Sequence, residues 1–493
     1  MDTNENDNHR NKRGKKTVII IVCEILILLL LIGSYRIYVL WKEKQTSSPN
    51  SGNSTSQEDK SSAQENASQN GENESSDGKQ EEVEDELSAE EIEAVKEQER
   101  LMQEEKERQE LINQADQLAL SYDYEGAIEL LKKYQGTEGS YEKYTTLVAA
   151  VERLEKEKSE LLLYGGSYQS VSEINHIFFH ALVADNSKAF DGDRMSRGYN
   201  MYMTTISEFK KMMQKMYEDG YVLVRMADLV KKVTKEDGTT IYEEGEIYLP
   251  AGKKPFVLSE DDVNYYEYME TDGFATRIVI GEDGKPTCEM RADDGSIITG
   301  DFDIVPILDA FVEEHPDFSY KGAKGLLAIT GYEGTLGYRT NDPESPTYEQ
   351  DVEQVKKVAQ ALKEDGWELG SHSWGHLNMT TASFEVFKKD TDKWMAEVGS
   401  LIGPTEIYVF PFGADIEVTT GSYSGEKFQY MKECGFTMFC GVYKSPWMYI
   451  KDDYMRMTRR PLDGQAMLEF PERLSDLFDV KDIIDPERPA KDW

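Results

Sequence analysis

The chain has 493 residues, which at about 100–200 residues per domain leaves room for two or three domains. Its 55 lysines and arginines stand against 94 aspartates and glutamates, a formal net charge of −39. This charge argues against nucleic acid as a partner, because phosphate binding needs clustered cations. Four cysteines, none in a CxxC pair, exclude a disulfide-built fold and a zinc ribbon.

An apolar segment near the N-terminus is the first feature along the chain. Residues 17–35 are almost wholly apolar, with Glu24 as the one charged residue, and are about long enough to cross a bilayer. The cations before the segment are Arg10, Lys12, Arg13, Lys15 and Lys16. The positive-inside rule therefore predicts a cytoplasmic tail over 1–16 and a transmembrane signal anchor over 17–41, with the rest of the chain outside the cell. A cleaved signal peptide is the alternative, but no small-residue cleavage site follows the run.

Polar segments separate this anchor from the rest of the chain. We expect residues 42–80 to be a disordered linker, because Thr46 to Gln80 offer no large apolar or aromatic side chain to bury. Residues 81–165 are expected to hold a charged helix, with a weak coiled coil as the alternative, and then a small helical module. Residues 115–134 predict two helices with a turn near Tyr124, similar to one tetratricopeptide-like pair, and residues 141–164 a third. We expect this module to be structural, and any protein partner is unknown.

From residue 166 to residue 493, strand-like apolar runs alternate with helical patterns. This alternation predicts an α/β fold with a parallel sheet, and the number of units predicts a barrel. The expected strands are Asn175–Phe179, Tyr221–Val224, Phe256–Leu258, Gly325–Ile329, Trp367–Ser371, Ile407–Phe410, Thr437–Cys440 and Tyr454–Met457. The expected helices are Ile206–Tyr217, Ile304–Glu314, Tyr348–Asp365, Ser383–Ile402 and Gly425–Glu433. Glu236–Leu249 and Thr276–Ile298 are expected to be hairpin insertions.

Three of these strands end in residues that carry chemistry, and catalytic groups on such barrels lie at the carboxyl ends of the strands. The residues are Glu260, Asp261 and Asp262 after the third strand, His372 and His376 after the fifth, and Pro411 and Phe412 after the sixth. Two imidazoles and a carboxylate suit a divalent metal such as Zn, Co, Ni or Fe. Three protein ligands leave a position open for the water that hydrolysis requires.

Together these residues resemble the polysaccharide deacetylases of the NodB-homology type, carbohydrate esterase family four. The first family motif is T-F-D-D-G, in whose place residues 259–263 read SEDDV. The second is H-S/T-x-x-H, which residues 372–376 match as HSWGH, and the third keeps its Pro-aromatic-Gly part at 411–413. The resemblance covers about residues 174–470. It implies a NodB-type distorted (β/α) barrel, with Asp261 as the catalytic base and Asp262, His372 and His376 as ligands of a divalent metal, zinc before cobalt, nickel or iron.

The sequence also departs from the family pattern. The arginine of the third motif is replaced by Val409, so nothing there orients the base, and no histidine follows His376 to serve as the family's late general acid. His176 and His180 form a rival pair that we interpret as strand residues, with His180 near the rim of the site. Cys434 and Cys440 could form a disulfide or remain free.

The expected function is a metal-dependent hydrolase that removes N-acetyl groups from cell-wall or surface polysaccharide outside the cell, tethered to the membrane through one helix. The expected substrate-binding residues, chosen from the third motif and from aromatic side chains whose faces suit sugar rings, are Phe412, Pro411, Tyr265, Tyr332 and Trp374. The alternative is a weakened or inactive glycan-binding or scaffold protein of the bacterial cell envelope, which the missing arginine and late histidine favour.

Overall fold

The computed structural model describes residues 88–164, 170–417, 421–491 and 493, all of them within one compact unit, Glu86–Trp493. The expected cytoplasmic tail, membrane anchor and disordered linker, residues 1–80, lie outside these residues. In the described part of the chain, no helix is both long and apolar enough to cross a membrane.

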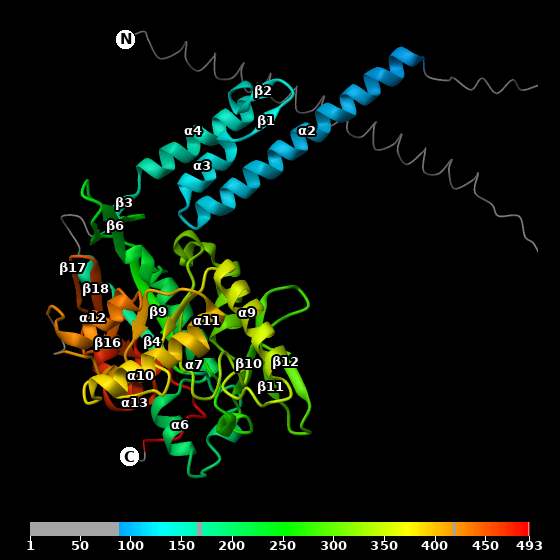
Figure 1. The fold of residues 1–493 in the computed structure, drawn as a ribbon. Helices are drawn as coiled ribbons and strands as arrows, with labels where there is room; N and C mark the ends of the chain where they lie inside the picture. Colours follow the sequence, from blue (N-terminus) through cyan, green and yellow to red (C-terminus); the bar gives the residue numbers. More distant parts are fainter. Residues whose placement is uncertain (1–87, 165–169, 418–420, 492) are drawn as a thin grey trace, which may run out of the picture. The chain divides into compact units, whose positions relative to one another are not determined.

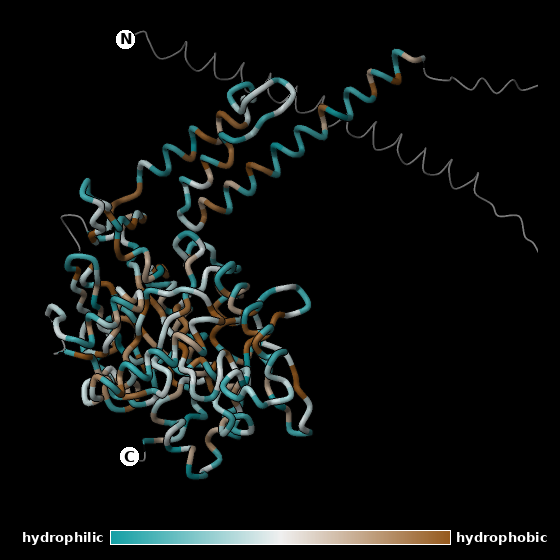
Figure 2. Tube along the Cα trace, viewed as in Figure 1, coloured by the Kyte–Doolittle hydropathy of each residue, from teal (hydrophilic) through white to brown (hydrophobic). Residues whose placement is uncertain are grey.

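The first described elements form the helical module: α2 (Ala89–Leu120), α3 (Tyr124–Lys132) and α4 (Thr145–Ser159). The expected charged helix and the first helix of the pair are one continuous 32-residue helix, which starts at a capping box between Ser88 and Glu91. No glycine or proline interrupts α2, and ion pairs such as Arg100–Glu104, at 2.6 Å, stabilise its polar surface. Figure 2 shows this polarity along α2. Its C-terminal half packs with α3 and α4 around Ala115, Ala119, Ala127, Leu131, Leu147, Val151 and Leu154.

The module contacts the barrel domain at two places. The hydroxyl of Tyr122 donates to the carbonyl of Asp317, at 2.8 Å, and its ring stacks on that of Tyr320. After α4, β3 (Leu162–Tyr164) pairs antiparallel with β8 (Ile247–Leu249). The predicted boundary at residues 165 and 166 therefore follows a strand that belongs to a sheet with the barrel domain.

Seven parallel strands close into a ring, which confirms the α/β barrel that the alternation predicts. They are β4 (Asn175–Phe179), β9 (Lys254–Glu260), β13 (Leu326–Ile329), β14 (Glu368–Ser371), β15 (Ile407–Val409), β16 (Met438–Val442) and β18 (Tyr454–Pro461). The spatial order is β13-β14-β15-β16-β18-β4-β9 (Figure 1), and β9 returns to β13 through the pairs Ser259–Leu326 and Glu260–Leu327.

Two further strands extend this sheet outside the ring. The predicted strand at Tyr221 forms as β5 (Tyr221–Leu223) and pairs with the start of β9. It stays outside because β13 takes the same edge of β9 further along, at residues 259 and 260. β17 (Met448–Lys451) pairs antiparallel with β18, which is separated from β9 in the ring by β4.

Helices cover the outside of the ring. They are α5 (Asn186–Ala189), α6 (Ser196–Tyr202), α7 (Ile206–Glu218), α8 (Ile304–Glu314), α9 (Tyr348–Glu364), α10 (Phe384–Trp394), α11 (Ser400–Ile402), α12 (Gly425–Glu433), α13 (Gly464–Glu469) and α14 (Val480–Ile483). The single helix predicted over 383–402 is α10 and α11 joined by a π-helical turn at Met395–Gly399. The hairpin expected over 236–249 lies earlier in the chain, because β6 (Val230–Thr234) pairs with β7 (Thr240–Glu244) while β8 pairs with β3. The hairpin expected over 276–298 is a three-stranded antiparallel sheet of β10 (Ala275–Ile280), β11 (Pro286–Arg291) and β12 (Ile297–Gly300).

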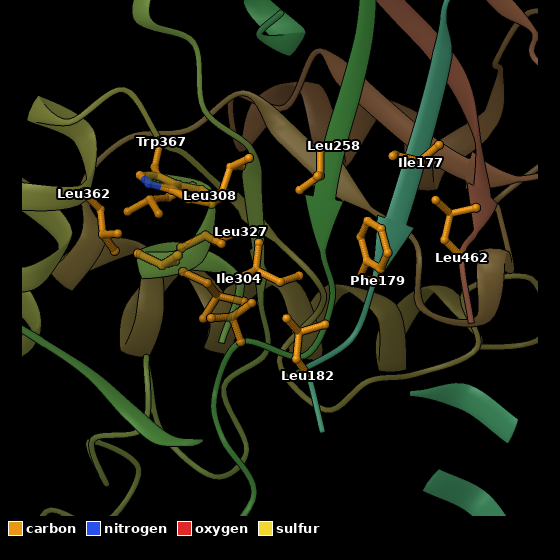
Figure 3. Close-up of a cluster of buried hydrophobic side chains, with 14 of the residues drawn as sticks. Ile177, Phe179, Leu182, Leu258, Ile304, Leu308, Leu327, Leu362, Trp367 and Leu462 are labelled. Atoms are coloured by element: carbon orange, nitrogen blue, oxygen red, sulfur yellow. The ribbon is translucent and has the colours of Figure 1, made fainter. Parts of the chain in front are cut away.

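Strand alternation divides the barrel core into two layers. Between the ring and the helices lie Phe179, Leu258, Leu308, Leu327, Leu362 and Trp367 (Figure 3). Inside the ring lie Val257, Leu326, Ala328, Val409, Cys440, Met455 and Met457. Because successive side chains of a strand point to opposite faces, Glu260 shares the outer face of Leu258, whereas Ser259 and Asp261 share the inner face of Val257. Cys440 lies inside the ring and Cys434 packs against the outer layer, and both are free thiols.

Candidate metal centre and active site

Three side chains predicted as metal ligands meet at the carboxyl ends of β9 and β14. Asp262, His372 and His376 each offer one ligand atom, and these atoms lie within 4.8 Å of one another. Oδ1 of Asp262 is 3.9 Å from Nε2 of His372 and 3.6 Å from Nε2 of His376. This Oδ1 is buried and has no hydrogen-bond partner among the described residues. Two imidazole nitrogens around an unsatisfied carboxylate oxygen fit a divalent cation.

The buried ligand His372 is held in the form that a metal needs. Its Nδ1 lies 2.9 Å from the carbonyl oxygen of Val409, which can only accept, so Nδ1 carries the proton and Nε2 keeps its lone pair. Burial lowers the pKa of His372 to about 4, so the ring is neutral at pH 7. Val409, which stands where the family has arginine, thus contributes through its backbone.

Asp390 of α10 fixes the backbone of the loop that carries His376. The two carboxylate oxygens of Asp390 accept from the backbone N–H groups of Trp374 and Gly375, at 2.9 and 2.7 Å. Asp262, His376 and the third-motif residue Phe412 all have left-handed backbone, with φ of 62°, 49° and 59°. Such conformations cost energy in residues other than glycine and are concentrated at functional sites.

Asp261, the predicted base, is buried inside the ring and paired with Arg459 of β18. Nη1 and Nη2 of Arg459 donate to Oδ1 and Oδ2 of Asp261, at 2.6 and 3.0 Å. Burial alone would raise the pKa of Asp261, but the Arg459 guanidinium, with His372 and His180, holds it well below its usual range. An arginine therefore does orient the base, and it comes from the last ring strand rather than from the third motif.

Sequence reasoning missed Arg459 because its signal is faint. Arg459 is fully buried in a strand where Met455 and Met457 share its inward face, so the period of two places a cation inside the ring. A buried cation needs a partner, and that rule could have linked Arg459 to one of the acidic residues after β9.

His176 and His180 do not form a metal pair. Nε2 of His176 lies 2.9 Å from Oγ of Ser259, which also accepts from Arg459 at 3.2 Å, so His176 belongs to the layer that supports the arginine. His180 lies at the end of β4 and lines a small cavity of about 50 Å³ together with Asp262. Its Nδ1 is buried without a hydrogen-bond partner in the described part of the chain. A histidine thus stands at the site although none follows His376.

Aromatic side chains flank the metal centre. The ring of Tyr332 lies 6.5 Å from Trp374 and 5.4 Å from Tyr266, which stacks on the exposed Tyr268. Phe412 is 70% exposed and its ring meets His376 edge-on, at 4.4 Å. These rings form a wall on which a sugar could stack.

Three of the singled-out residues are more enclosed than a sugar contact would suggest. Tyr265 is 4% exposed and only borders the cavity beside Asp262, and Pro411 is buried beneath Phe412. Glu260 is wholly buried on the outer face of β9. Burial, reinforced by the Asp303 carboxylate, raises its pKa. Glu260 therefore lies away from the site, as the alternation of the strand predicts.

The described residues thus form an α/β barrel with an Asp–Arg pair beside a candidate Asp–His–His metal site. Residues 346–439 match the family model of the polysaccharide deacetylases. This stretch of the chain therefore matches the polysaccharide deacetylases, which confirms the family that its motifs resemble and supports an amide-hydrolysing enzyme. The matched stretch contains His372 and His376 but neither Asp261 nor Arg459.

Comparisons with whole proteins give distant similarities. No curated protein matches this chain. Among solved structures, a Streptococcus pyogenes deacetylase, PplD, in complex with acetate is 13% identical, with a TM-score of 0.34 over 62% of this chain and 97% of that one. BA0330 from Bacillus anthracis, which carries a provisional polysaccharide deacetylase assignment, is 10% identical, with a TM-score of 0.31 over 58% of this chain and 64% of that one.

Proposed function

We propose that the chain is a metal-dependent deacetylase that removes N-acetyl groups from a cell-wall or surface polysaccharide outside the cell. The observation that carries this proposal is the buried Asp261, aligned by both nitrogens of Arg459, beside the Asp262–His372–His376 cluster. A base and three metal ligands within one site suit hydrolysis of an unactivated amide by an activated water.

The residues of the chain divide the reaction between them. A divalent ion held by Asp262, His372 and His376 would supply Lewis acidity at the acetyl carbonyl and at the attacking water. Asp261, kept ionised by Arg459, accepts the proton of the water as its oxygen bonds to the carbonyl carbon. His180 donates a proton to the amide nitrogen as the C–N bond breaks. The products are acetate and a free amine on the sugar.

His180 suits the role of acid because of its position. It lines the same cavity as Asp262 and leaves a buried Nδ1 unpaired. Its electrostatic influence reaches the carboxylates of both Asp261 and Asp463. The missing third-motif arginine and late histidine favoured an inactive binding protein. We propose that Arg459 of β18 and His180, which follows β4, take their roles.

The proposed location rests on the sequence near the N-terminus, and the proposed substrate class rests on the aromatic side chains beside the site. The apolar run over 17–35, with cations before it, supports an anchor that leaves the barrel domain outside the cell. The wall formed by Tyr266, Tyr268, Tyr332 and Trp374 supports a glycan, because aromatic faces stack on sugar rings.

The experiment is acetate release from N-acetylated chitooligosaccharides and from peptidoglycan, with the full chain loaded with Zn²⁺ or Co²⁺. We expect acetate from the wild type and almost none from Asp261→Asn or from protein stripped of metal. Absence of acetate from every substrate with either metal would return the chain to the class of glycan-binding or scaffold proteins.

A further inference from the structure

We infer that the glycan carries an anionic group, a phosphate or a carboxylate, and that this group binds in a cationic pocket beside the active site. The cationic pocket is a cavity of about 200 Å³ whose lining includes Tyr443, Lys444, Arg460, Asp463, Phe470 and Arg473. The inference rests on the proposed function, since it names the substrate class of the same enzyme.

The cationic pocket opens at the edge of the barrel that holds the catalytic residues. Lys444 follows the end of β16 by two residues, and Asp463 follows the end of β18 by two. Both strands run parallel to β9, so their carboxyl ends share one rim with Asp261. Val442, which also lines the pocket, packs against Gly413 of the third-motif turn. A polymer bound at the metal centre therefore has this pocket within reach along the rim.

The three cations of the cationic pocket come from separate elements, and only one of them forms an ion pair with a carboxylate. Arg460 of β18 is neutralised by Asp476, with both guanidinium nitrogens at 2.8 Å from its carboxylate. Lys444 and Arg473 have no carboxylate within ion-pair distance anywhere in the described ranges 88–164, 170–417, 421–491 and 493. Two unpaired cations converging on one cavity stand out in a chain with a net charge of −39.

The one carboxylate in the lining does not cancel these two cations. Asp463 caps α13, where its Oδ1 accepts from the N–H of Ala466 at 2.7 Å. Even when it is fully ionised, Asp463 offsets only one of the two positive charges of Lys444 and Arg473. The lining therefore keeps a net positive charge.

The arrangement suits an anion better than a neutral sugar. A neutral sugar ring would need a free aromatic face. The guanidinium of Arg473 lies 3.8 Å from the ring centre of Phe470, and the ammonium of Lys444 lies 5.9 Å from that of Tyr443. What the pocket offers instead is the planar fork of Arg473 and the ammonium of Lys444, the groups that bind carboxylate and phosphate oxygens. Without such a local attraction, the overall negative charge of the protein would repel an anionic polymer.

The test compares three matched N-acetylated oligosaccharides: one neutral, one with a phosphate and one with a carboxylate. The full-length Lys444→Gln/Arg473→Gln variant is compared with the wild type and with Lys235→Gln, which removes an exposed cation of the β6–β7 hairpin. We expect KM for at least one anionic substrate to rise about tenfold or more in the double variant, with kcat and the neutral substrate little changed. The anionic substrate that responds identifies the group.

The inference would be overturned if the wild type had the same KM for the neutral and both anionic substrates and the double variant left these KM values unchanged. The proposed deacetylase activity would still stand in that case. Absence of acetate from all three substrates is instead a failure of the proposed function. In that case calorimetric titration of the same oligosaccharides decides: binding of the anionic ones that the double variant loses supports the pocket, and equal binding of all three refutes it.

Discussion

Asp261 and Arg459 form a buried ion pair in which each side chain depends on the other. Breaking such a pair leaves an unpaired buried charge, which costs about 3–5 kcal/mol. We expect Arg459→Gln to lower the free energy of unfolding by about 3 kcal/mol and to abolish most acetate release. Adding Asp261→Asn should restore much of the stability and none of the activity, measured by denaturant melts and an acetate assay. Equal stability of the single and double variants would contradict the pairing.

The base and the metal ligands can be separated by measuring metal content. Asp261→Asn should keep bound metal while acetate release falls by about 10²–10⁴-fold, because an amide cannot accept the proton of the water. Asp262→Ala or His372→Ala should lose stoichiometric metal, since each removes one of three ligands. Unchanged metal in both of the latter variants would mean that the site has been misplaced.

The proposed role of His180 as the acid can be distinguished from a role as a metal ligand. We expect His180→Gln to retain metal and fold, because the side chain is outside the ligand cluster, and to lose about 10²-fold or more in acetate release. The matched control is His176→Gln, which changes a histidine of β4 that contacts Ser259 behind Arg459 and does not line the cavity beside Asp262. Loss of metal from His180→Gln would place this histidine among the ligands instead of at the leaving amine.

At the scale of elements, much of the barrel could be predicted from short apolar runs. The strand at Asn175–Phe179 and the helices at Ile304–Glu314 and Gly425–Glu433 have the predicted bounds, because buried strands and capped helices carry their signals locally. The position of β5 outside the ring could not be predicted, since it depends on which neighbour β9 takes along its length. Arg459 was missed for the same reason: its partner lies 198 residues away in the sequence.

The attachment of the helical module is testable through one side chain. Tyr122 is 6% exposed, stacks on Tyr320 and donates to the carbonyl of Asp317. We expect Tyr122→Phe to cost about 1 kcal/mol of unfolding free energy for the lost hydrogen bond, and Tyr122→Ala about 3 kcal/mol. A fragment over 170–493 should still fold, but less stably than one over 88–493, because it also loses the pairing of β3 with β8. Equal melting temperatures of the two fragments would show that these contacts do not stabilise the barrel.

For the whole molecule, buried carboxylates make stability depend on pH. Asp309 of α8 accepts from Lys324 at 2.6 Å and from Trp367, and burial raises its pKa to about 7 from an ordinary 3.8. Between these values the folded chain holds a proton that the unfolded chain has lost, so this group makes stability fall as pH rises from about 4 to about 7.

Asp309→Asn removes this titration. We expect the wild type to lose about 2 kcal/mol more than the variant between pH 5 and pH 8, since one pKa unit corresponds to about 1.4 kcal/mol. Asp301→Asn, at an exposed position shortly before α8, is the control. Parallel stability curves for wild type and Asp309→Asn would show that the carboxyl titrates at its ordinary pKa.

The closure of the ring has a consequence for how the enzyme is made. The first ring strand, β4, pairs with the last, β18, through Ile177 and Arg460. A ribosome therefore finishes β4, β9, Asp261 and the three proposed metal ligands before it reaches β18, whose Arg459 pairs with Asp261. Until Arg459 has been synthesised, Asp261 lacks the guanidinium with which it pairs in the folded chain. The last ring strand thus completes the wall of the barrel and its catalytic site in the same step, and a chain truncated before it would carry the metal ligands without the residue that aligns the base.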